Sequence, residues 1–200
     1  MKLEAAADAS YACHSDGAGH SGIVCRVGGA TVFAKSGKQR LVAKSSTEAE
    51  LLALNGATDE VLYLRNLLAE LDLMQTEPTP IHQDNKSAII LAERGELGTK
   101  RTKHFNVRHY FVTQHLRERS VELRYEPGTL IDADGLTKVL VGSYGREWSE
   151  RILAPKLCEH DPETRTETNS IVRGGVPDDS RNENGRIRRS YAAVVRGDRS

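Results

Sequence analysis

Apolar residues recur at helical spacing over one long stretch of the chain, which predicts a helix from Glu48 to about Leu71. Serine and threonine at 45–47 precede it, and these residue types commonly cap a helix N-terminus. The predicted apolar face carries Glu50 together with Leu54, Ala57, Val61, Leu64 and Leu68. Glu48 lies about 200° around the helix from Glu50, so it is expected to point outward. The helix therefore directs one acid, Glu50, towards the interior.

Runs of alternating or β-branched apolar residues, bounded by glycine and proline, predict strands on both sides of this helix. The expected strands are residues 3–12, Gly22–Gly28, Ala30–Ala34, Thr79–Gln83 and Val121–Tyr125. The first is expected to be short and weak, because alanine has a low β-propensity. A further turn and strand are expected between Lys35 and Val42, and shorter helices at Asn85–Ala92, about Phe105–Arg119 and Leu130–Val139. The fold class is therefore α/β, with a mixed five-stranded sheet flanked by helices.

Charge adds a local pattern to this picture. The 28 basic and 28 acidic residues cancel, so net charge gives no argument for a nucleic-acid partner. However, the stretches between Asp16 and Glu48 and between Glu96 and Glu118 contain basic residues and no acid. Two interpretations stay open: a phosphate backbone lies across these basic stretches, or they form a solvated face.

The cysteines and the apolar runs limit the cellular setting. The three cysteines are widely spaced and do not form a CxxC pair, so a disulfide framework is not expected and a reducing compartment fits better. Cys13, His14, His20 and Cys25 lack the close ligand pair that structural zinc sites use. No apolar run resembles a signal peptide or a membrane span. We expect an intracellular protein, cytoplasmic or nuclear, that has no membrane partner.

Four acids stand in four distinct sequence contexts: Asp8 in AADAS, Glu50 in KSSTEAELLAL, Asp84 in IHQDNKSA and Asp134 in IDADGLTK. Carboxylates this far apart can meet only in the fold, where they repel one another unless a cation neutralises them. An all-carboxylate site suits magnesium or manganese better than zinc. Two of these acids, taken alone, also have a structural interpretation: Asp84 as a helix cap and Glu50 as half of a buried ion pair.

The order of these motifs resembles the ribonuclease H domain, and more closely the one at the carboxyl end of copia-type retrotransposon Pol polyproteins. The matching motifs span about residues 5–140 and are DAS, KQRLVAKSSTEAELLAL, QDNKSAIILAE, RTKHFNVRHYFV and ADGLTK. The resemblance implies a ribonuclease H-like fold and endonucleolytic cleavage of the RNA strand of RNA–DNA hybrids. Catalysis and metal binding would then be performed by Asp8, Glu50, Asp84 and Asp134.

By this resemblance the cofactor is a pair of Mg²⁺ ions, with Mn²⁺ as a substitute, and Asp8 bridges them. One ion would activate a water for in-line attack and the other would stabilise the leaving 3′ oxygen. Contacts to 2′-hydroxyls would select the RNA strand, with Asn85 and Ser87 as donors. The remaining expected contacts to the hybrid are Lys100, Lys103, His104 and Arg108.

The chain also departs from the family pattern. No histidine stands between Tyr125 and Asp134, where cellular ribonucleases H carry one, and Val139 follows Lys138 where proline is usual. Because only seven residues precede Asp8, we expect a C-terminal fragment of a Pol polyprotein whose reverse transcriptase domain lies upstream. The alternative function is a catalytically silent remnant that persists as a nucleic-acid-binding or scaffold module.

Composition changes near residue 142 and again near 158. The expected organisation is a ribonuclease H-like domain at 1–141, a short helical extension at 142–157 and a disordered tail at 158–200. The tail ends in several arginines, which indicates either a solvated tail or a nucleic-acid tether.

Overall fold

A computed structural model describes residues 1–95 and 103–154, except for the side chains at 103–107 and 109. The predicted tail at 158–200 lies outside the described residues. The predicted division at residues 141 and 157 stays a prediction.

A five-stranded mixed sheet forms the centre of the described part, in the order β3-β2-β1-β4-β5. β2 pairs antiparallel with both β1 and β3, whereas β4 is parallel to β1 and to β5. The strands are β1 (Leu3–Ser10), β2 (His20–Val27), β3 (Ala30–Lys38), β4 (Thr79–Gln83) and β5 (Val121–Tyr125). The predicted mixed five-stranded sheet is therefore confirmed.

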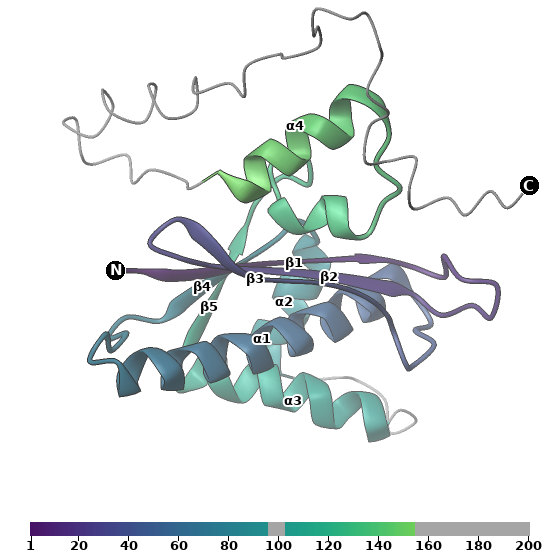
Figure 1. Ribbon diagram of the computed structural model, residues 1–200. Helices are drawn as coiled ribbons and strands as arrows, with labels where there is room; N and C mark the ends of the chain where they lie inside the picture. Colours follow the sequence, from purple (N-terminus) through teal and green to yellow (C-terminus); the bar gives the residue numbers. More distant parts are fainter. Residues whose placement is uncertain (96–102, 155–200) are drawn as a thin grey trace, which may run out of the picture. The chain divides into compact units, whose positions relative to one another are not determined.

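The first strand is paired with its neighbour more completely than its composition predicted. β1 lies at the centre of the sheet and pairs with β2 at every position from Leu3 to Ser10. Ala7 is completely buried, in a sheet that helices cover on both faces (Figure 1). The expectation of a weak strand was wrong because burial outweighed the low β-propensity of alanine.

The next hairpin also differs from the prediction. β2 and β3 are joined by Gly28 and Gly29, which both have positive φ, as a two-residue hairpin turn requires. β3 then continues to Lys38, opposite His20, so no separate strand forms between Lys35 and Val42. The polar residues at the end of β3 are held in the ladder by pairing with β2, which their composition alone did not indicate.

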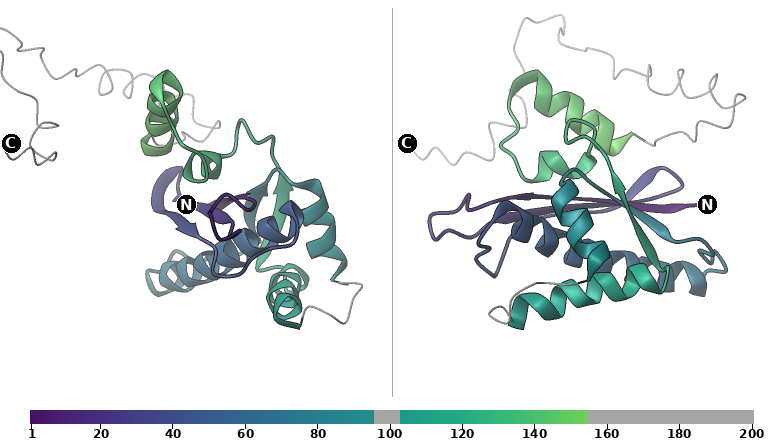
Figure 2. Two further views of the ribbon diagram at one scale, coloured as in Figure 1. Left: turned by 90° about the vertical axis from the view of Figure 1, so that its right-hand side faces the viewer. Right: turned by 180° about the vertical axis from the view of Figure 1, so that it is seen from behind.

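Helices cover both faces of the sheet (Figures 1 and 2). α1 (Ser46–Glu70), α2 (Lys86–Arg94) and α3 (Lys103–Arg117) pack together on one face. The short 3₁₀ helix η1 (Asp132–Leu136) and α4 (Gly142–Leu153) lie on the other. The helix expected at Leu130–Val139 is thus reduced to five residues. No helix in the described ranges is long and apolar enough to cross a membrane.

Two apolar clusters hold these layers together. The larger one lies between the sheet and α1 to α3 and is mostly aliphatic. It includes the fully buried Cys25, whereas Cys13 is exposed, so these cysteines do not share a zinc site. The smaller cluster joins Ala6 and Val24 of the sheet to Ile152 of α4, with Trp148 packed against it.

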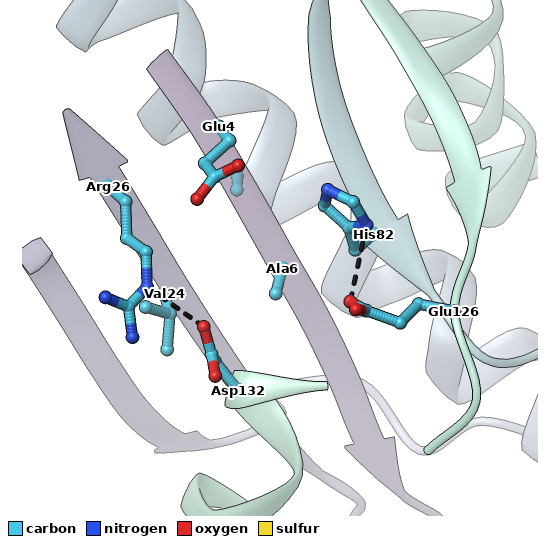
Figure 3. Close-up of a pocket in the computed structure, with 8 residues that line it drawn as sticks. Glu4, Ala6, Val24, Arg26, His82, Glu126 and Asp132 are labelled. Atoms are coloured by element: carbon cyan, nitrogen blue, oxygen red, sulfur yellow. Dashed lines mark hydrogen bonds and ion pairs between the residues drawn. The ribbon is translucent and has the colours of Figure 1, made fainter. Parts of the chain in front are cut away.

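A buried ion pair fixes η1 to the sheet (Figure 3). Arg26 of β2 and Asp132 of η1 are 2% and 3% exposed, and Arg26 Nε lies 2.9 Å from Asp132 Oδ2. The other guanidinium nitrogens donate to backbone carbonyl groups at Gly29, Arg151 and Ala154. Arg26 belongs to a basic stretch that the sequence associated with phosphate binding. Its burial excludes that role, because every nitrogen already has a partner inside the protein.

Candidate metal centre

Three of the four predicted acids converge at one point. Asp8 comes from β1, Glu50 from near the start of α1, and Asp84 from the residue after β4. One oxygen of each carboxylate lies within 4.8 Å of the others. Asp8 and Glu50 are buried and Asp84 is half-buried. This separation allows a single cation to contact all three.

Strand direction explains the convergence of Asp8 and Asp84. β1 and β4 are parallel neighbours, so the residues near their carboxyl ends meet at the same edge of the sheet. Gly22 of β2 pairs with Asp8, and a Cβ there would lie 2.6 Å from the carbonyl oxygen of Ala133. The absence of a side chain at Gly22 therefore lets η1 approach the strand beside Asp8.

The start of α1 places Glu50. Ser45 is the N-cap and accepts a hydrogen bond from the backbone N–H of Glu48, 3.2 Å away. Glu48 Oε2 in turn accepts from the backbone N–H of Lys44 at 2.7 Å. Glu48 is therefore used at the helix end, and Glu50 turns inward, as predicted.

The helix-cap interpretation of Asp84 is wrong. Asn85 is the N-cap of α2, and its Oδ1 accepts from the backbone N–H of Ala88 at 3.0 Å. The carboxylate of Asp84 is thus available to the cluster. Asn85 and Ser87 were predicted to donate to the RNA strand. Asn85 is half-buried with its oxygen engaged in the cap, whereas Ser87 is exposed.

Gln83 is a site residue that the sequence analysis missed. Its side chain is fully buried, and Nε2 donates to Glu50 Oε2 at 3.1 Å. Its Oε1 accepts from the backbone N–H groups of Asp84 and Asn85, at 2.8 and 3.2 Å. One amide therefore links two of the three acids. The only sequence signal was its position beside Asp84, which does not specify a buried side chain.

Asp134 lies on η1, outside the group of three mutually close carboxylates found among the described residues. It is buried, forms an ion pair with Lys138 and accepts from the Tyr144 hydroxyl at 3.1 Å. The neighbouring Thr137 hydroxyl donates to Asp8 Oδ2. The segment that carries the fourth acid is thus bonded to the first, through contacts that the sequence analysis did not predict.

The electrostatics of the cluster favour a cation. Burial, then repulsion from Asp8 and Asp84, raises the pKa of Glu50 to about 8. Burial also raises the pKa of Asp8, although the Thr137 hydrogen bond opposes this, and repulsion from Asp84 and Asp134 adds to the increase. The pKa of Asp84 rises through burial and repulsion from Asp134. A divalent cation would relieve this repulsion between buried carboxylates. The ligands of such a site are all carboxylate oxygens, so the residues fit magnesium or manganese.

The expected contacts to a hybrid are only partly described. Lys100 lies outside the described residues, as do the side chains of Lys103 and His104. Arg108 is exposed on α3 and lines a groove of about 520 Å³ between α1 and the β2–β3 hairpin. The groove also includes Lys35, Lys38 and Arg40 from the first basic stretch.

No family model matches the sequence of the chain. The sequence does match parts of much longer proteins. It is 32% identical over 120 residues to the retrovirus-related Pol polyprotein from transposon TNT 1-94 of Nicotiana tabacum, covering 60% of the chain. It is 27% identical over 153 residues, 76% of the chain, to the Pol polyprotein from transposon RE1 of Arabidopsis thaliana. The chain is homologous to retrovirus-related Pol polyproteins of plant transposons. It spans about a tenth of their length, 9% and 10% respectively.

Among solved structures, the N-terminal RNase H domain of a Mycobacterium tuberculosis protein, fused to maltose-binding protein, aligns with a TM-score of 0.49. The two sequences are 14% identical, and the alignment covers 75% of this chain and 97% of the chain in the solved structure. The resemblance to a retrotransposon Pol polyprotein, which the motifs predicted, is confirmed. The strand order and the two helical layers agree with the predicted ribonuclease H-like fold.

Proposed function

We propose that this chain cleaves the RNA strand of an RNA–DNA hybrid, using two Mg²⁺ ions for which Mn²⁺ can substitute. The observation that carries the proposal is the convergence of Asp8, Glu50 and Asp84 within 4.8 Å. Homology to Pol polyproteins supports the choice of substrate, because reverse transcription produces such hybrids. By the same resemblance, the chain would act beside a reverse transcriptase domain.

The residues of the site would have separate roles in metal binding, positioning and substrate contact. Asp8, Glu50 and Asp84 would hold the cations, and Asp134 would complete the set. Bound ions would supply an activated water for attack on the phosphorus and would stabilise the leaving 3′ oxygen. Gln83 orients the Glu50 carboxylate, and Thr137 orients Asp8. Ser87 is exposed at the start of α2, three residues after Asp84, and would contact a 2′-hydroxyl.

The experiment that tests the proposal is cleavage of a labelled hybrid by the purified protein with Mg²⁺, with Mn²⁺ or with EDTA. We expect RNA-strand cleavage that requires the metal and is abolished in Asp84→Asn. The matched control is Asp72→Asn, because Asp72 is an exposed acid after the end of α1. Hybrid binding without cleavage by a folded wild-type protein would refute the nuclease and favour the silent binding module.

The basic groove is the proposed path for part of the nucleic-acid backbone. Lys35 contacts Glu60 at 3.4 Å and Lys38 contacts Asp16 at 2.6 Å, so these lysines are already partly neutralised. Arg40 and Arg108 are the exposed arginines of the groove. Replacing both with glutamine should weaken hybrid binding and reduce the slope of log affinity against log salt by about 0.9 for each phosphate that the variant no longer neutralises. An unchanged slope would place the backbone elsewhere.

A further inference from the structure

The fourth acid already has a cationic partner. Lys138 follows Asp134 by four residues, just beyond η1, and its ammonium forms an ion pair with the buried Asp134 carboxylate. The Lys138 side chain is 57% exposed, whereas Asp134 is 5% exposed. The ammonium therefore lies where the acid cluster meets solvent, on a flexible stem that can leave without unfolding the chain.

The charge of Lys138 acts on more than one acid. The pKa of Lys138 is raised, first by its hydrogen bond to Asp134 and further by the charges of Asp134 and Asp8. Reciprocally, Lys138 acts against burial to lower the pKa values of Asp8 and Asp84. The ammonium thus serves as a counter-ion for Asp134, Asp8 and Asp84 when no metal is bound.

This pairing separates Asp134 from the other acids in function. Asp8, Glu50 and Asp84 are close enough to share one cation, and Asp134 is outside that group. A cation that recruits Asp134 must compete with the ammonium of Lys138 for the same carboxylate. A cation held by the other three acids does not face this competition directly.

We propose that Lys138 is an internal counter-ion that competes with the second divalent cation for Asp134 and so sets how tightly that cation binds. The inference rests on the metal-binding part of the proposed function and is independent of cleavage. Lys138 is a positioning residue under this proposal: it holds Asp134 ready in the metal-free protein and releases it when the second cation arrives. The wild-type protein is then expected to bind one cation tightly and the second weakly.

The test is calorimetric titration of the full chain with Mn²⁺ and with Mg²⁺, in the absence of nucleic acid. We compare wild type, Lys138→Met and Lys138→Arg, with Lys2→Met as an exposed control. Removing the competing charge in Lys138→Met should tighten binding of the second cation about tenfold, while the first dissociation constant changes less. Lys138→Arg keeps the charge and should behave as wild type.

A second measurement, thermal unfolding in EDTA, does not depend on metal binding. Lys138→Met should unfold at a lower temperature than Lys2→Met, because it leaves Asp134 buried without its cation. Dissociation constants within twofold of wild type, or weaker second binding, would overturn the proposal. If no variant binds any cation, the metal-binding function fails as well. Binding of one cation by wild type and by Lys138→Met alike would overturn only the role of Lys138.

Discussion

Glu50 should destabilise the metal-free protein at alkaline pH. Glu50 is 6% exposed, and burial followed by repulsion from Asp8 and Asp84 raises the pKa of its carboxyl group from 4.5 to about 8. Between these two values the folded protein keeps a proton at Glu50 that the unfolded chain has released. The free energy of unfolding therefore falls as the pH rises through this window.

The magnitude follows from the same two values. A difference from 4.5 to about 8, at about 1.4 kcal/mol per pH unit, corresponds to about 5 kcal/mol once the carboxyl is ionised. This is an upper value, because water or a buffer cation can enter the cluster and relieve part of the cost. Glu50→Gln keeps an oxygen that can accept from Gln83 and removes the charge. It should raise the free energy of unfolding by about 1–5 kcal/mol at pH 8.5, and by much less at pH 4.5.

The assay is urea unfolding of wild type and Glu50→Gln in EDTA at intervals from pH 4.5 to 9. Glu70→Gln serves as control, because Glu70 is exposed at the other end of α1. Added Mg²⁺ should stabilise wild type at pH 8.5 more than it stabilises Glu50→Gln, which should also lose cleavage activity. A stability difference that does not change with pH, or a variant less stable than wild type at pH 8.5, would refute the reasoning.

Three further predictions concern the residues that hold the site together. Gln83→Met should lower kcat for hybrid cleavage at least tenfold. It should also lower the free energy of unfolding in urea by about 1–3 kcal/mol, because the backbone N–H groups of Asp84 and Asn85 lose their acceptor. Kinetics matching those of the exposed control Gln114→Met would contradict this. Gly22→Ala should destabilise by about 1–3 kcal/mol, since its Cβ would press on η1, and unchanged stability would show that η1 can shift freely. Arg26→Met should cost about 3–5 kcal/mol, because buried Asp132 loses its closest cationic partner and three backbone carbonyl groups lose their donor, although Arg151 Nε still lies 3.3 Å from Asp132 Oδ1. The urea midpoint measures this, and a loss below about 1 kcal/mol would argue against the buried pair.

The elements that the sequence predicted well are those whose local signals agree with their surroundings. β4 and β5 were predicted with the bounds that the structure shows, because proline, glycine and short apolar runs limit both strands. α1 was predicted because its apolar period is long and its N-cap residue types are clear. For these segments the tertiary environment reinforces the local preference.

The sequence analysis named the three acids that converge and missed the residues that contact them. Each acid lies in a motif that can be read along the chain, whereas Gln83 and Thr137 act through contacts across 33 and 129 residues. Arg26 was grouped with surface cations because its partner, Asp132, is 106 residues away. Local sequence carries no signal for such pairs, so only the fold could distinguish a buried clamp from a phosphate contact.

The metal-free site is held by donors that a cation would have to displace or share. Glu50 receives a hydrogen bond from Gln83, Asp8 receives one from Thr137, and Asp134 is paired with Lys138. Because these contacts offset part of the repulsion among the acids, the chain can fold before any cation binds. The same contacts lower the apparent affinity for metal, since part of each carboxylate is already satisfied. The affinity for each cation should therefore depend on these donors as much as on the acids, and a variant that removes a donor should change metal binding and metal-free stability in opposite directions.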